Sequence, residues 1–150
     1  MNEISLINDY IINQLQQDVL VNTISIVPTL TLDLNKENIY PLVNFDMKDI
    51  EIQDQVIVVS FTFTVLQQRD VRPIKTDSKL LTNTNYIDNI NETHSIAQRF
   101  VNILNRQNNT ENIEIQSLST LRLLKSWNQG ELDGVQFDID LSIPNIGSSC

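Results

Sequence analysis

One long alternation of apolar and polar residues, over residues 56–67, most narrowly restricts how this chain can fold. Between its apolar positions stand Ser60, Thr62 and Thr64. Successive side chains of a strand point to opposite faces of a sheet, so the pattern predicts a strand packed on one side and exposed to water on the other. The apolar positions are Ile57, Val59, Phe61, Phe63 and Val65.

Two other segments repeat apolar residues with the spacing of a helix. Residues 3–20 and residues 86–106 each place them at three- and four-residue steps, which predicts an amphipathic helix with one buried stripe. His94, the only histidine, falls within the second stripe, and we expect it to be a hydrogen-bonded core residue. The stripes consist of Ile4, Ile7, Ile11 and Leu15 in the first segment, and of Ile87, Ile90, Ala97, Val101 and Leu104 in the second.

Shorter extended segments precede the long strand. Residues 23–34 predict a strand that contains Pro28. Because proline has no N–H to donate to a neighbouring strand, this segment should lie at a sheet edge or bend at that point. Residues 39–46 predict a second short strand, and residues 47–55 a short connection into the long strand, for which an extended conformation at Ile50 and Ile52 is the alternative.

The C-terminal part of the chain predicts a hairpin. Its first strand contains the apolar positions from Ile113 to Leu124, residues 127–134 make the turn, and residues 135–143 alternate strictly. A slip of one residue would bury Asp138 and Asp140, so the register of the last strand is well defined. The order helix, three strands, helix, two strands predicts one α+β domain over residues 1–150, with two helices packed on a mainly antiparallel sheet.

Residues 68–85, between the long strand and the second helix, show no periodicity. Loops of this length are usually functional or flexible. The cations of this segment make it either a solvated loop or a contact arm for an acidic partner or a neighbouring subunit. Trp127, beside the hairpin turn, either anchors a protein interface or folds back over the core. The candidate interface residues are therefore Arg69, Arg72, Lys75, Lys79 and Trp127.

The chain contains no convergent set of catalytic groups. Asp138 and Asp140 lie on the predicted wet face of one strand, and a cation site would need further oxygen ligands. Asp46 and Lys48 belong to a D-x-K triplet that resembles restriction-type nucleases in three residues only. A glycine-rich phosphate loop, HExxH and CxxC are all missing from the sequence. We therefore predict no catalytic residues, no metal, no cofactor and no enzymatic activity.

Charge and composition exclude several other classes. The net charge of −9 opposes general binding to nucleic acid, which depends on clustered lysine and arginine. No apolar run approaches the roughly 20 residues of a membrane helix, and the N-terminus lacks the pattern of a secretory signal. Cys150, the only cysteine, cannot form an internal disulfide, so we expect synthesis in a reducing cytoplasm.

The order of these elements resembles the tail-terminator and neck-ring proteins of tailed bacteriophages. The resemblance spans nearly the whole chain and includes the short strand Ile39-Tyr40-Pro41-Leu42-Val43 and the last strand, residues 134–144. The abundance of asparagine agrees with a phage structural gene, such as one of the crAss-like group. The resemblance implies a homo-oligomeric ring in the virion neck or tail, made in the host cytoplasm and without enzymatic activity. It implies connector, tube, sheath or portal-associated rings as partners, and DNA that passes through the channel without specific binding.

Two other functions compete with a ring-forming virion protein. The first is a cytoplasmic adaptor, or binding module, that holds a partner through residues 68–85. The second is a metal-dependent nuclease built on Asp46 and Lys48, which a magnesium-dependent cleavage assay would reveal. Mass measurements separate the ring from the adaptor, because a ring has a defined stoichiometry.

Overall fold

The predicted long strand, β3 (Val56–Gln68), lies at the centre of a six-stranded sheet. A computed structural model describes residues 3–28, 40–69, 85–106, 112–126 and 132–145. Strand β3 pairs antiparallel with β2 (Leu42–Ile52) on one side and with β6 (Leu132–Pro144) on the other. The short β1 (Thr23–Ser25) adds to β2 in parallel, and β4 (Glu114–Leu118) and β5 (Arg122–Ser126) both pair with β6.

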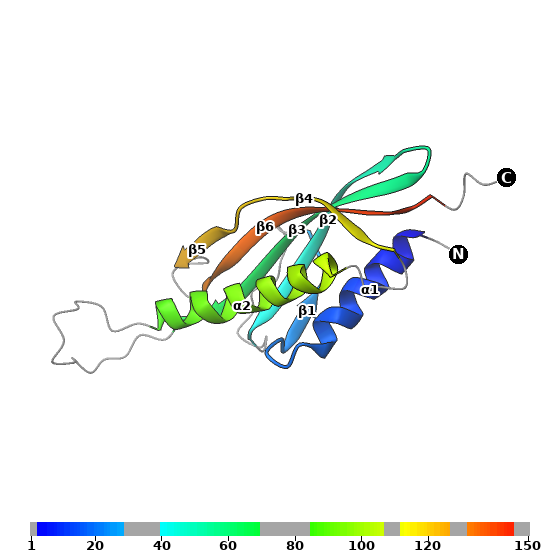
Figure 1. Cartoon of the computed structure of the whole chain (residues 1–150). Coiled ribbons are helices and arrows are strands. Elements are labelled where there is room, and N and C mark those ends of the chain that lie inside the picture. Colours follow the sequence, from blue (N-terminus) through cyan, green and yellow to red (C-terminus); the bar gives the residue numbers. More distant parts are fainter. Residues whose placement is uncertain (1–2, 29–39, 70–84, 107–111, 127–131, 146–150) are drawn as a thin grey trace, which may run out of the picture.

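Two helices cover one face of this sheet, α1 (Glu3–Gln17) and α2 (Tyr86–Asn105), as Figure 1 shows. The predicted α+β class, with two helices on a mainly antiparallel sheet, is confirmed. Helix α1 ends earlier than predicted because Asp18 begins a turn, in which its carboxylate accepts a hydrogen bond from the Leu20 N–H at 3.0 Å. Neither helix in the described ranges is long and apolar enough to cross a membrane.

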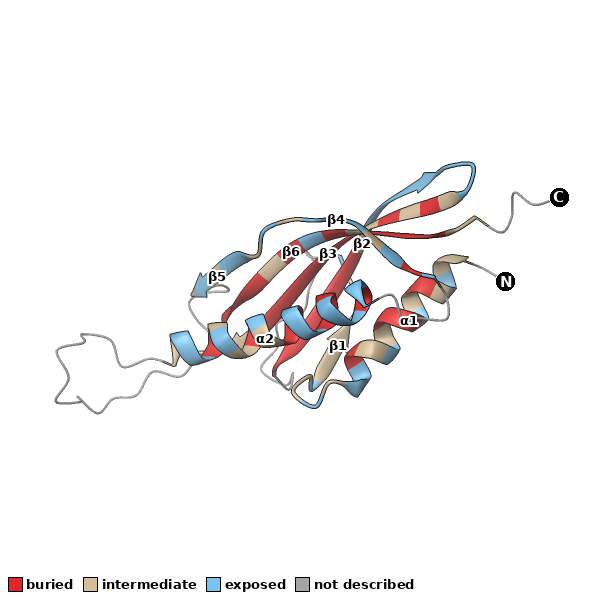
Figure 2. Cartoon of the chain, viewed as in Figure 1, coloured by how far each residue is buried: buried red, intermediate tan, exposed pale blue. Residues whose placement is uncertain are grey.

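The main core lies between the helices and the sheet, where the buried residues of α1, α2 and the central strands meet (Figure 2). Phe63 is at its centre, with its ring 5.6 Å from that of Phe45, 5.2 Å from that of Phe137 and 5.0 Å from that of Phe100. Offset stacked and tilted rings at such distances add to the free energy gained by burial alone. These contacts join β2, β3, β6 and α2 in one apolar layer.

Strand β2 is longer than the sequence pattern suggested. The prediction of a short strand followed by a connection at residues 47–55 is wrong, because β2 continues to Ile52, which pairs with Ile57 of β3. A register shift between Met47 and Asp49 disturbed the alternation on which that prediction depended. In Figure 1 the resulting β2–β3 hairpin extends past the helices, and there Ile50 is 48% exposed and Ile52 75% exposed.

The second face of the sheet is only partly open to water. Thr64 and its strand neighbour Asn44 are fully buried, so the prediction of a wet face is wrong at this end of β3. The Asn44 amide donates a hydrogen bond to the Val27 carbonyl and accepts one from the Val27 N–H, each 3.1 Å long. One side chain thereby satisfies the backbone of the segment that follows β1, and its own burial costs little. A second apolar cluster lies beyond Thr64 on this face and comprises Leu42, Leu66 and Leu132.

The predicted first strand of the closing hairpin consists of two short strands. Strand β4 pairs with the C-terminal half of β6 and β5 with its N-terminal half. Between them, the Ser119 N–H donates to the Asp138 carbonyl at 2.9 Å. The sequence indicated this break, because Leu118 and Leu124 stand at even positions whereas Leu121 and Leu123 stand at odd ones. These apolar residues could not all lie on one face of a single strand.

Gly134 is a strand residue in β6, although the sequence pattern assigned it to the turn. It pairs with Leu66, and a Cβ atom placed on it would lie 1.9 Å from the Val65 carbonyl oxygen and 2.9 Å from the Val65 carbonyl carbon. The backbone cannot yield there without breaking the central ladder. Glycine is therefore required by close approach of the neighbouring backbone.

We expect Gly134→Ala to lower the free energy of unfolding by about 2 kcal/mol or more, because the added methyl group must displace the backbone of β3. Urea denaturation would measure the loss. Ser60→Ala, at a half-buried position of the same central strand, is the control and should change stability by less than about 0.5 kcal/mol. Equal stability of Gly134→Ala and wild type would contradict the close approach.

Candidate functional site

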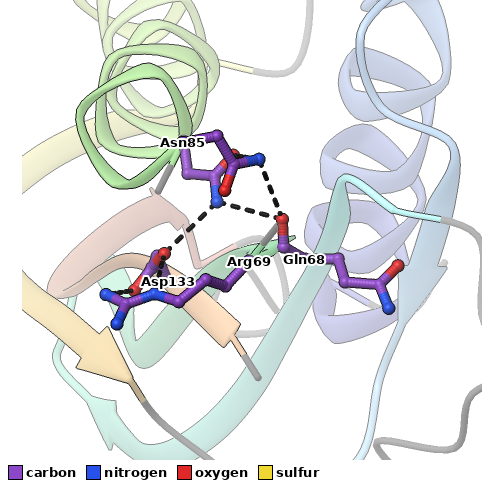
Figure 3. Close-up of polar contacts among 5 residues, drawn as sticks. Gln68, Arg69, Asn85 and Asp133 are labelled. Atoms are coloured by element: carbon purple, nitrogen blue, oxygen red, sulfur yellow. Dashed lines mark hydrogen bonds and ion pairs between the residues drawn. The ribbon is translucent and has the colours of Figure 1, made fainter. Parts of the chain in front are cut away.

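The ends of three elements meet beside Arg69 and Asn85, the described residues that flank residues 70–84. Strand β3 ends at Gln68, α2 begins at Tyr86, and β6 begins at Leu132. The polar groups that join these ends form a cluster that we call the clamp (Figure 3). It comprises the backbone carbonyl of Gln68 and the side chains of Arg69, Asn85, Asn89 and Asp133.

The centre of the clamp is a buried ion pair. Asp133 is fully buried, and the Arg69 guanidinium donates to both of its carboxylate oxygens, from Nε at 2.9 Å and from Nη2 at 2.6 Å. Asn89, also buried, donates a third hydrogen bond to Asp133 at 3.2 Å. A carboxylate removed from water needs such a complete set of donors, because the charge loses its hydration.

A second set of hydrogen bonds joins the two ends of the intervening segment. The Gln68 carbonyl accepts from the side-chain amides of Asn89 at 3.0 Å and Asn85 at 3.4 Å, and the Asn85 amide also donates to Asn89 Oδ1 at 3.1 Å. The backbone at Gln68 and the start of α2 therefore lie within one side-chain length of each other. The described residues that flank residues 70–84, Arg69 and Asn85, are therefore held at a single point of the domain.

The charge of Arg69 is stabilised by its surroundings. Hydrogen bonding to the Asp133 carboxylate raises the pKa of Arg69 above its ordinary value, although burial of the guanidinium acts in the opposite direction. The guanidinium carbon also lies 5.5 Å from the centre of the Tyr86 ring, and the Lys125 ammonium lies 5.6 Å from the same ring. Both distances suit attraction between a cation and an aromatic face. The Arg69 guanidinium therefore keeps its positive charge, which the Asp133 carboxylate balances within the clamp.

An open polar cavity of about 570 Å³ lies beside the clamp. The two carboxylates in its lining, Asp88 and Glu92, come from α2, and Gln67 donates to Glu92 at 3.3 Å. Its lining consists of Gln67, Gln68, Arg69, Asn85, Asp88, Asn89 and Glu92. The arrangement can hold the base of a chain segment firmly, and it offers polar groups of both signs to a neighbouring molecule.

Only one of the predicted interface residues lies in the described ranges. Arg69 is bound to Asp133 inside the chain, so its guanidinium anchors the segment instead of extending from it. Arg72, Lys75, Lys79 and Trp127 lie outside the described residues, and the structure says nothing about their positions.

Sequence reasoning missed Asp133 and Asn89, and it placed His94 wrongly. His94 and Ile87 are exposed, and the buried stripe of α2 instead includes Asn89 and Thr93. The first half of α2 covers the polar clamp, which selects polar buried residues, and only its second half covers the apolar core. Asn89 lies at helical spacing from Thr93, Ile96 and Phe100, so a polar extension of the apolar stripe was the available signal.

The acidic residues considered for metal binding are each engaged by neighbouring side chains. Asp138 accepts from Thr62 at 2.7 Å and from Arg122 at 3.0 Å, and Asp140 accepts from Ser117 at 2.7 Å. Asp46 pairs with Lys48 at 2.7 Å in the middle of β2, not at a strand end. Within the described ranges, no three residues of the types His, Cys, Asp and Glu are grouped as metal ligands would be.

Comparison with protein-family models and with curated proteins finds no match to this chain. The function must therefore be inferred from the geometry of the molecule itself.

We expect Asp133→Asn to lower the free energy of unfolding by about 3 kcal/mol, since it leaves the half-buried Arg69 cation without its counter-charge. The control is the same substitution at Asp138, which is also a β6 carboxylate paired with an arginine but has a side chain 52% exposed; it should cost less than about 1 kcal/mol. Urea denaturation of both variants at neutral pH measures the difference. Similar losses of unfolding free energy at the two positions would contradict the larger loss expected for the buried carboxylate.

Asp138 gives a prediction about pH. The hydrogen bonds from Arg122, and then from Thr62, lower the pKa of Asp138 below its ordinary value of 3.8. A carboxylate with a lower pKa in the folded state stabilises the protein above the unfolded-state pKa, and this contribution is lost as the pH falls through the folded-state pKa. Asp138→Asn should therefore be less stable than wild type at neutral pH and equally stable in strong acid. Denaturation at a series of pH values tests this, and a stability difference that persists in strong acid would contradict it.

Proposed function

We propose that this chain is a structural virion protein that forms an oligomeric ring at the phage neck or tail end. The observation that carries the proposal is the β2–β3 hairpin, which extends past the helices and exposes Ile50 and Ile52. Exposed apolar side chains on a projecting element are costly for an isolated subunit and useful at an interface. A ring in which every subunit uses the same head-to-tail contact has a use for such an element.

The overall charge supports a place around a DNA channel. A net charge of −9 repels the phosphate backbone, so DNA could pass through the ring without being bound. The partners of such a ring would be further copies of the chain and the adjoining connector, tube, sheath or portal-associated rings.

The decisive experiment is a measurement of mass and symmetry. We expect the purified protein to form a closed ring as its concentration is raised, as detected by light scattering after size-exclusion chromatography and by negative-stain imaging. We also expect the protein in purified virions. A protein that stays monomeric at high concentration and is absent from particles would contradict the proposal.

The clamp favours the adaptor as a second candidate function. It fixes both ends of residues 70–84 at one point, which is a suitable base for a segment that contacts another molecule. In the ring proposal this molecule is a neighbouring subunit or neck protein, and in the adaptor proposal it is a separate acidic partner. A monomeric wild-type protein would favour the adaptor.

We expect the double substitution Arg72→Glu and Lys75→Glu to impair assembly, because it reverses the charge of two cations in the segment, and to leave the melting temperature of the monomer unchanged. The assembled mass at fixed concentration is the measurement. The control is Lys36→Glu, which reverses the charge of a lysine outside both this segment and the clamp. If assembly survives the first double substitution, residues 70–84 are only a solvated loop.

A further inference from the structure

The turn of the β2–β3 hairpin is tied to the end of the neighbouring strand. Strand β6 runs beside β3 as far as its first residue, where Pro144 pairs with Val56. The next residue, Asn145, makes two hydrogen bonds to the turn. Its backbone N–H donates to the Gln55 carbonyl and its side-chain amide donates to the Gln53 carbonyl, both at 2.9 Å. The turn is therefore held at two points from outside the hairpin.

The residues of the turn do not favour the geometry that a tight hairpin needs. The Gln53 N–H donates to the Val56 carbonyl at 2.9 Å, so only Asp54 and Gln55 lie between the paired residues. Two-residue turns that match the twist of the strands need a positive φ, usually where glycine follows asparagine or aspartate. Gln55 stands in the place of that glycine, and neither Asp54 nor Gln55 has a positive φ. Turns of the other types splay the strands, so this hairpin needs support from elsewhere in the protein.

Apolar packing contributes little at the tip. Residues 51–55 are exposed, and in Figure 1 this part of the hairpin extends past the helices. Ile52, at the end of β2, is 75% exposed, so little apolar surface is buried there to hold the strand in place. Asn145 is half-buried beside the turn. The orientation of the tip therefore depends on hydrogen bonds more than on burial.

We propose that Asn145 is a positioning residue that holds the hairpin tip in a fixed orientation for contact with a neighbouring subunit. An element that is ordered before it binds loses less conformational entropy on binding, and the same contact is then tighter. A ring also needs the tip of every subunit to point in the same direction, because each step around the ring repeats one interface. This inference rests on the proposed function and names the residue that prepares its projecting element for assembly.

Asn145→Ala tests the side-chain part of this support. It removes the hydrogen bond to the Gln53 carbonyl and keeps the backbone N–H that binds Gln55. We expect amide hydrogen exchange of residues 51–57 to become roughly fivefold to tenfold faster, while the midpoint of urea unfolding changes little. Self-association should weaken roughly tenfold, as measured by sedimentation over a range of concentrations.

The matched control is Asn22→Ala. The Asn22 side-chain amide also donates to a backbone carbonyl, that of Tyr40, at 2.8 Å and in an exposed position, but it lies away from the hairpin. This variant loses the same kind of hydrogen bond, so its hairpin should exchange, and the protein should associate, as in wild type.

A rescue experiment separates positioning from any other role of Asn145. Asp54→Asn with Gln55→Gly gives the turn the residue pair that most favours a tight hairpin, so its order no longer depends on Asn145. Added to Asn145→Ala, this pair of substitutions should return both hydrogen exchange and self-association to near wild-type values.

Three results would overturn the inference and leave the ring intact. They are unchanged hairpin exchange in Asn145→Ala, faster exchange with wild-type self-association, and restored exchange without restored self-association in the rescued variant. A wild-type protein that stays monomeric at high concentration would instead overturn the proposed function and this inference together.

Discussion

The arrangement of the molecule depends on a mismatch of length between its sheet and its helices. Strand β3 has 13 residues, which span about 43 Å, whereas α2 with 20 residues spans about 30 Å and α1 with 15 residues about 22 Å. The main core nevertheless extends along β3 as far as Val59 and Ile57, so the exposed part of this face lies on β2. There Ile50 and Ile52, which pair with these two residues, continue the alternation of core residues without the burial.

The other end of β3 lies beside buried polar groups, which need hydrogen-bond partners within the protein. The sheet is covered on both faces there, so Asp133 has no access to water and depends on Arg69 and Asn89 for its hydrogen bonds. Such a pair gives little net stability compared with an apolar substitute, but it is strongly destabilising to break. The hydrogen bonds of Asp133 connect three elements, since Arg69 follows β3, Asn89 belongs to α2 and Asp133 belongs to β6. The pair therefore fixes these three elements in one relative position.

The sequence predicted the elements whose burial follows a simple period. Strands β3 and β6 and both helices have one apolar face, and their predicted bounds agree with the structure to within three residues. The sequence did not predict burial where it depends on strand register or on the polar partners of a side chain. The register shift in β2 hid the continuation to Ile52, and the polar clamp displaced the buried stripe of α2 from His94 and Ile87 to Asn89 and Thr93. Asp133 was hidden for a similar reason, because a buried acid close to a turn looks like an exposed one until its partner, 64 residues away, is known.

The two features proposed to act in assembly lie at opposite ends of the same strand. The clamp holds the last residues of β3, and the exposed Ile50 and Ile52 of β2 pair with Val59 and Ile57 near its start. Between them, β3 is paired with β6 without a register shift from Val56 to Gln68, and glycine at position 134 lets the two backbones approach closely. A fully paired, buried central strand resists bending, so the distance and direction between the two ends are fixed. A subunit that must repeat one geometry around a ring needs such a fixed spacing between its contacts, whereas an adaptor with a single contact does not.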